Sequence, residues 1–152
     1  MPTGSVVRDT VGLRPRTGRG ASAWLLMVLE AQLAVGAYGG ALMMTVIQPD
    51  DFLPPAWLAR TPFDSWVLPG IGLLLANAVL PTVALVVEAR GLPWAFLAHA
   101  AVGGVLVGWI TLQLLVIGCV APAFQIGYLS LGLVILGLAL RGLRGTARSG
   151  TA

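Results

Sequence analysis

Two ionisable side chains lie inside apolar stretches of this sequence. Glu30 falls in the first such stretch and His99 in the third. A charged carboxylate inside hydrocarbon is costly unless it is paired, hydrated or protonated. If both stretches are helices that start from the same side of a membrane, Glu30 lies ~10 Å deep and His99 at a similar depth. The sequence therefore predicts a Glu30–His99 pair, which serves either proton-linked chemistry or only the register of the helices.

Further polar residues accompany this pair as candidates for an intramembrane polar site. Asn77 precedes Pro81 by four positions, and a proline inside a helix frees the carbonyl four residues earlier. We expect a kink there. The Asn77 amide either repairs local hydrogen bonds or reaches a neighbouring helix, and the functional alternative is a polar point on a solute path. Gln113 lies near the helical face of His99, but apolar residues between them argue against a continuous proton wire. Glu88, at the end of the second stretch, is expected to be an interfacial charge.

The rarer residue types exclude several chemistries. All nine basic residues are arginine, and the chain has one histidine and one cysteine. A lysine Schiff base is therefore excluded, as are a closed zinc site, a bis-histidine haem and a CxxC redox pair within one subunit. The sequence also contains no Ser-His-Asp set, HExxH motif or phosphate-binding loop. We expect a protein that is not an enzyme, with no catalytic residue, metal or cofactor.

The composition identifies the solvent in which these residues must work. Of the 152 residues, 57% are apolar and 10% are charged, against roughly 45–50% and about 25% in soluble globular proteins. The mean hydropathy is +0.90. A soluble core of this size cannot hide so much apolar surface. The composition disfavours a disordered chain, a disulfide scaffold and a cytosolic enzyme, and it favours a membrane protein.

Four apolar stretches are long enough to cross a bilayer, whose core of about 30 Å needs roughly 20 helical residues. Each must be helical, because an unpaired backbone has no hydrogen-bond partner in lipid. The first stretch is too long to be a cleaved signal sequence. We expect an all-α membrane four-helix bundle over residues 22–141, with spans at 23–47, 66–87, 94–117 and 124–140. Residues 1–21 and 142–152 are expected to be disordered cytoplasmic tails.

The arginines predict the orientation of the bundle. With four spans, both tails lie on one side, and only Arg60 among the nine arginines lies on the other. Arginine accumulates on the cytoplasmic side of membrane proteins. Both termini are therefore expected in the cytoplasm, with Trp24 and Trp94 at the inner interface and Trp66 at the outer one. Arginine without lysine, in a chain rich in Ala, Gly and Leu, is typical of a GC-rich bacterial genome, so we expect the cytoplasmic membrane of a bacterium.

The longest connection, residues 48–66, contains four prolines, which prevent a long helix. A short turn near 56–60 is expected to lie flat on the membrane. We interpret the loop as an outer cap that includes Trp57 and Phe63, and a lid over a cavity open to the outside is the alternative.

Small residues at helical spacing predict close helix contacts. Gly36 and Gly40 are four apart in the first span, and Ala100, Gly104 and Gly108 form a longer stripe in the third. Helices in lipid associate where small residues let their backbones approach. We expect internal helix packing at these positions, and an interface between two copies of the chain is the alternative.

Two stretches, residues 36–70 and 109–140, resemble a family of small bacterial four-helix membrane proteins. That family has a Gly-rich first helix, a loop ending in Thr-Pro-Phe and then Pro-Gly, a Trp-Ile and Gln pattern in the third helix, and a closing Gln, Tyr and Gly. The matching positions here are Thr61, Pro62, Phe63, Pro69, Gly70, Trp109, Ile110, Gln113, Gln125, Tyr128 and Gly132. The chain departs from the pattern in lacking a glycine near Asp51 and in having Ile126 where a proline is common. The resemblance implies the four-span plan and no particular activity.

Two functions fit the sequence. The first is a noncatalytic accessory or membrane-organising subunit, whose partners are membrane lipid and either further copies of the chain or a larger membrane complex. The tails are too short and too weakly basic to indicate nucleic-acid binding. The second is a proton-coupled carrier of small or lipid-like solutes that uses Glu30, by analogy with small multidrug transporters, which the chain is similar to in that one residue and in its span count. The first predicts a bundle without a continuous cavity, and the second predicts a cavity that reaches Glu30.

Overall fold

The computed structural model describes residues 20–149, with side chains to residue 145, and over this range the chain is helical with no strand. Four helices are long and apolar enough to cross a membrane, at Ala21–Ile47, Val67–Ala89, Ala95–Val116 and Pro122–Gly145. These match the four predicted spans and confirm the all-α bundle. The first span consists of α1 (Ala21–Leu42) and the π-helical η1 (Met43–Ile47), and the second of α2 (Val67–Leu73), η3 (Leu74–Val79) and α3 (Leu80–Ala89). The third and fourth are α4 (Ala95–Val116) and α5 (Pro122–Ser149).

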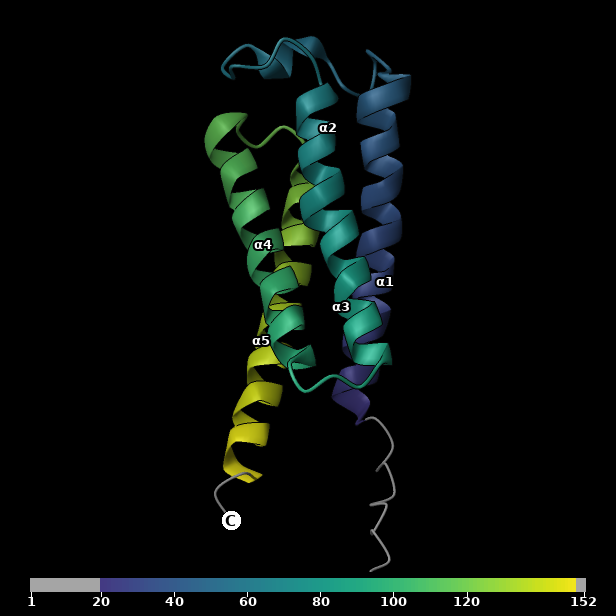
Figure 1. Ribbon diagram of the computed structural model, residues 1–152. Coiled ribbons are helices and arrows are strands. Elements are labelled where there is room, and N and C mark those ends of the chain that lie inside the picture. The colour runs from purple at the N-terminus through teal and green to yellow at the C-terminus, as the bar shows by residue number, and fades with distance from the viewer. Residues whose placement is uncertain (1–19, 150–152) are drawn as a thin grey trace, which may run out of the picture.

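The four spans stand side by side and alternate in direction (Figure 1). The start of α1, the turn between α3 and α4 and the end of α5 lie at one end, which we call the terminal end. The loop between η1 and α2, which contains the short helix η2 (Pro55–Leu58), lies at the other end, which we call the loop end. All connections are therefore at the two ends of the bundle, where a membrane protein meets water.

The surface of the bundle is apolar along its length. Val35, Val46 and Leu115 are each more than 70% exposed, at 73%, 71% and 79%. The core is a thin line of side chains between the helices, formed by Leu26, Leu33, Ala84, Val102, Leu106, Ile110 and Ile135. So large an exposed apolar surface is stable only against lipid. The chain is a multi-pass membrane protein.

Helix α5 is longer than the sequence predicted. The fourth span was expected to end near residue 140 and to be followed by a disordered tail, yet the helix continues to Ser149. The ring of Phe96 lies against Gly142, so α5 still packs on α4 past the expected end. Arginine is a good helix former, and its positive charge interacts favourably with the C-terminal end of a helix. These two properties explain why the helix continues beyond its apolar residues. The tail prediction is wrong for residues 142–149, and residues 1–19 and 150–152 lie outside the described range.

The second span contains the irregularity expected at Pro81. Segment η3 is a π-helix, in which the Leu80 N–H donates to the Leu75 carbonyl five residues back. Pro81 lacks an N–H, and its ring crowds the carbonyl of Asn77, so the turn before it widens. The Thr82 hydroxyl donates to the Ala78 carbonyl across the same turn at 2.8 Å. The widened turn holds Asn77 inside the bundle.

Glycines set the closest helix contacts, only partly where predicted. Gly36 lies against the Tyr128 hydroxyl and Gly40 against Leu73, as expected for packing positions. Gly104 and Gly108 are exposed, and a Cβ on either would meet nothing within 4 Å. The prediction of internal packing is therefore wrong for those two residues. Ala100 is half-buried.

A close approach of α4 to α5 occurs instead at Gly103. A Cβ there would lie 2.6 Å from the Leu136 backbone nitrogen and 2.8 Å from its Cα. Gly132 of α5 faces Leu106 and Val107 of α4 in the same way, at 3.0–3.2 Å. One glycine from each helix therefore lets the two backbones touch.

The loop at the loop end has a small core of its own. Leu53, Leu58 and Trp66 are buried there, with Met44, Trp57 and Phe63 packed against them. The Trp66 indole N–H donates to the Leu53 carbonyl at 2.9 Å, and the Trp57 ring meets the Trp66 ring edge-on with centroids 6.4 Å apart. Trp57 and Phe63 thus belong to a packed cap. Trp66, predicted to lie at the outer membrane interface, is buried by the residues of this cap.

We predict that Gly103→Ala destabilises the bundle by about 1–3 kcal/mol, because the added methyl group pushes the backbone of α5 away. Gly104→Ala is the matched control: it makes the same gain in helix propensity, up to ~1 kcal/mol, and meets no neighbour. The free energy of unfolding in mixed detergent micelles measures both. Equal effects of the two substitutions would contradict the packing described for Gly103.

Candidate functional site

Three ionisable side chains from three helices meet inside the bundle, nearer its terminal end. The Glu30 Oε1 of α1 lies 2.8 Å from the His99 Nδ1 of α4. The Glu88 Oε2 of α3 lies 3.4 Å from the other ring nitrogen, Nε2. We call Glu30, His99 and Glu88 the triad. The structure brings together the predicted pair and adds a carboxyl group that the sequence did not assign to it.

The turn between α3 and α4 places Glu88 opposite His99. Gly91 adopts a left-handed conformation, with φ at +65°, that ends α3. Its N–H donates to the Glu88 carbonyl at 2.9 Å, and the Leu92 N–H donates to the Val87 carbonyl at 3.2 Å. This is the usual glycine-dependent end of a helix, in which the chain reverses within a few residues. Helix α4 then runs back along α3, so its second turn faces the last turn of α3.

Glu88 is therefore not the interfacial charge that the sequence indicated. Its side chain is buried, with 8% of the residue exposed, because α4 folds over it. The signal that could have identified it is the short glycine turn between Glu88 and His99. Two helices joined by so short a connection are antiparallel neighbours, and residues near the two sides of the turn come together.

The triad is shielded from solvent. Glu30 and His99 are both 0% exposed. The Phe96 ring lies one turn before His99 and meets its imidazole at a steep angle, with centroids 6.2 Å apart. The contacts of His99 join α1, α3 and α4, so the imidazole is the centre of a hydrogen-bonded connection among three of the four spans.

The second carboxyl oxygen of Glu30 takes no part in the hydrogen bond to His99. Oε2 is buried, and it has no hydrogen-bond partner among the described residues. A buried acceptor without a partner costs about 1–3 kcal/mol, and more when it is charged. A proton on this carboxyl group removes most of that cost, because the group is then neutral.

Asn77 and Gln113, the other two candidates for the polar site, lie away from the triad. Asn77 is 1% exposed, and within the described chain neither atom of its amide has a partner. It neither repairs the turn before Pro81 nor bonds to a neighbouring helix. Gln113 is half-buried on α4, about 21 Å along the helix from His99 at 1.5 Å per residue. The four predicted residues do not form one site.

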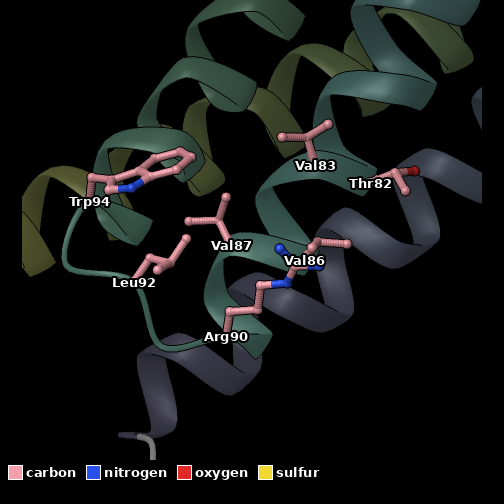
Figure 2. A pocket seen from close by; sticks show the side chains of 7 residues that line it. All are labelled: Thr82, Val83, Val86, Val87, Arg90, Leu92 and Trp94. Atoms are coloured by element: carbon pink, nitrogen blue, oxygen red, sulfur yellow. The ribbon is translucent and has the colours of Figure 1, made fainter.

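An apolar hollow of about 330 Å³ opens between α3 and the start of α4 (Figure 2). Trp94 and Leu92 face Val87 across it, and Arg90 lies at its edge. Thr82, Val83 and Val86 complete its lining. None of the triad residues lines this hollow, so it gives a bound molecule no contact with Glu30 or His99.

Comparisons with protein-family models, curated proteins and solved structures find no match to the chain. Within the described range, no group of three His, Cys, Asp or Glu side chains could hold a metal ion. The imidazole lies between the two carboxyl groups, so the three residues do not converge on one point. The chemistry open to the triad is that of hydrogen bonds and protons.

We predict that His99→Ala destabilises the protein by about 3–5 kcal/mol, because it leaves two carboxyl groups buried without the imidazole. Glu30→Ala removes the other half of the shorter bond. The double substitution should cost less than the sum of the two by about 0.5–3 kcal/mol, since the two residues interact directly. Unfolding in detergent measures all three variants. Gln32→Ala, which changes an exposed polar residue on the same helix, is the control, and additive effects would contradict the pair.

Proposed function

We propose that this chain is a noncatalytic accessory or membrane-organising subunit of the bacterial cytoplasmic membrane. One observation carries the proposal: the triad is buried in a packed interior, and the hollow between α3 and α4 makes no contact with the triad residues. A carrier or enzyme needs its acid–base groups to meet a substrate, whereas the fully buried Glu30 and His99 side chains bond within the triad. Their arrangement suits a residue set that holds three helices in register.

We also propose that both termini face the cytoplasm and that the chain belongs to the small bacterial four-helix family it resembles. Among the arginines of residues 20–149, Arg60 lies in the loop at the loop end, whereas Arg90 follows α3 and Arg141, Arg144 and Arg148 lie on the last turns of α5, at the terminal end. Trp24 and Trp94, near the terminal end, are 55% and 47% exposed, which suits anchors among lipid headgroups. The charge distribution and the exposed indole rings thus support the same orientation.

The exposed face of α4 supports a role in contact with other membrane proteins. Gly104 and Gly108 leave the helix backbone open to the outside, next to Val105 and Leu112. Helices in lipid associate through such small-residue faces. The partner is either a second copy of the chain or another subunit of a membrane complex.

We predict that a photo-crosslinking residue at position 105 captures a membrane protein at fixed stoichiometry, whereas the same residue at position 102 does not. Val105 is 38% exposed and Val102 is 1% exposed, so the two valines of one helix form a matched pair. The measurement is crosslinking of the full chain in its native membrane, followed by mass determination of the adduct. A chain that stays monomeric and without adducts in native membrane would contradict the proposal.

A proton-coupled carrier of small solutes is the second candidate, and the buried Oε2 of Glu30 favours it. This oxygen has no partner in the described chain, so it offers an acceptor to a proton or to a donor group of a solute. The carrier function requires an opening toward Glu30 during transport.

For the carrier, we predict that Glu30→Gln abolishes solute uptake driven by a proton gradient into liposomes that contain the purified protein. The amide keeps the shape of the carboxyl group but cannot release a proton. Asp64→Asn makes the same chemical change in an exposed loop residue and should leave uptake unchanged. Folding of both variants is checked by helical content and by elution as a single species in detergent. Uptake that survives Glu30→Gln would exclude this mechanism.

A further inference from the structure

We propose that the triad is a proton-binding site that holds one exchangeable proton and passes it between Glu88, near the terminal end, and Glu30, inside the bundle. The ligand is the proton itself. The proposal stands on the geometry of two carboxyl groups on opposite nitrogens of one imidazole.

Counting hydrogens shows why one extra proton belongs to the site. A neutral imidazole carries a single N–H, so it can donate at Nδ1 or at Nε2 but not at both. Two ionised carboxylates accept only, so one of the two contacts would then set a carboxylate oxygen against a nitrogen lone pair. Adding one proton resolves this, because either the imidazole becomes doubly protonated or one carboxyl group donates. In both arrangements each contact has a donor and the triad carries one negative charge.

Distances indicate where the proton is held. The 2.8 Å separation between Glu30 Oε1 and His99 Nδ1 is typical of a charge-assisted hydrogen bond. The 3.4 Å separation on the Glu88 side is longer than a normal hydrogen bond. The contact between His99 and Glu30 is therefore the tighter of the two, and the contact with Glu88 is the looser one.

The transfer carries a net one proton in two steps: the Glu88 O–H and His99 Nδ1–H bonds break, and a His99 Nε2–H and a Glu30 O–H bond form. A proton on Glu88 Oε2 passes to His99 Nε2, which makes the imidazole doubly protonated. The ring then releases its Nδ1 proton to Glu30 Oε1. Glu88 ends as a carboxylate, His99 as a neutral imidazole with its hydrogen on Nε2, and Glu30 as a neutral acid. The reverse sequence returns the proton.

The position of the triad gives this transfer a direction. Glu88, the next-to-last residue of α3, retains a small exposure of 8%, whereas Glu30 and His99 have none. Protons therefore enter and leave through Glu88. On the Glu30 side, its unpartnered Oε2 leads no further within the described chain, so the path ends inside the membrane.

The charged groups around the triad come from each helix that packs on it. Glu30 is the contribution of α1, Glu88 that of α3 and His99 that of α4. Arg90 follows Glu88 and lines the hollow of Figure 2. On α5, Arg141 and Arg144 are exposed near the terminal end.

Both an accessory subunit and a carrier can contain such a proton-binding site. The site depends on the function of the chain only if the chain is a carrier. The test therefore measures the proton and not transport. His99 is the only histidine in the chain, so isotope-labelled histidine gives one pair of ring-nitrogen signals in magnetic resonance. Infrared spectroscopy reports a protonated carboxyl group by its C=O stretch.

The experiment uses the full chain in lipid bilayers over a range of pH. We expect either a doubly protonated His99 or a neutral His99 with one protonated carboxyl group, and the loss of that single proton at alkaline pH. The number of protons on the triad is measured on the wild-type protein, so this result does not depend on whether any variant folds. A neutral His99 beside two ionised carboxylates at every pH would overturn the proposal.

The route is tested by exchange of the His99 Nδ1 hydrogen with solvent. We expect Glu88→Gln to slow this exchange on the order of 100-fold, the usual size of a lost acid–base step, while the Glu30–His99 bond remains. Asp64→Asn is the matched control and should leave the rate unchanged. An unchanged rate in a folded Glu88→Gln protein would show that the proton does not pass through Glu88.

Discussion

Hydrocarbon offers no hydrogen bonds, so a carboxyl group and an imidazole buried in it are stable only against one another. Glu30 and His99 meet this requirement at 2.8 Å, and the contact requires α1 to lie beside α4. Glu88 then completes the second side of the imidazole and ties α3 to the same point. Leucine contacts between helices tolerate rotation and sliding, whereas these bonds require particular atoms at particular distances. The polar centre thus determines the order and depth of three helices that are otherwise similar.

The fourth helix is positioned by shape. Gly103 and Gly132 let the backbones of α4 and α5 touch, and the neighbouring side chains fill the seam around them. No polar contact between α5 and the triad is needed for this. The bundle therefore combines two kinds of helix association, one by hydrogen bonds among α1, α3 and α4 and one by close packing between α4 and α5. Each can be weakened separately by substitution.

The sequence predicts the spans because the length of an apolar run reflects the thickness of the bilayer, and it predicts the Glu30–His99 pair because depth can be counted along two helices. It does not predict which side of a helix faces inward. Gly103 and Gly104 are adjacent, yet they point about 100° apart around the helix, and only the packed structure distinguishes the buried one.

Glu88 and Trp66 illustrate a second limit on prediction. Each lies at the end of an apolar stretch, where a charge or an indole is normally interfacial, and each is buried by a segment that folds over it. Helix α4 covers Glu88, and the proline-rich loop covers Trp66 through its bond to Leu53. Such coverage depends on turns and on neighbours that hydropathy does not describe.

The length of α5 has a consequence for how the molecule sits in lipid. Its 28 residues rise about 42 Å, against a hydrocarbon thickness of about 30 Å. The helix must therefore either tilt or extend beyond the hydrocarbon layer, with its arginine residues at the protruding end. Such a helix resists movement along the membrane normal, because an inward shift would move its guanidinium groups out of the headgroup layer. It would keep the triad at a constant distance from the water at the terminal end.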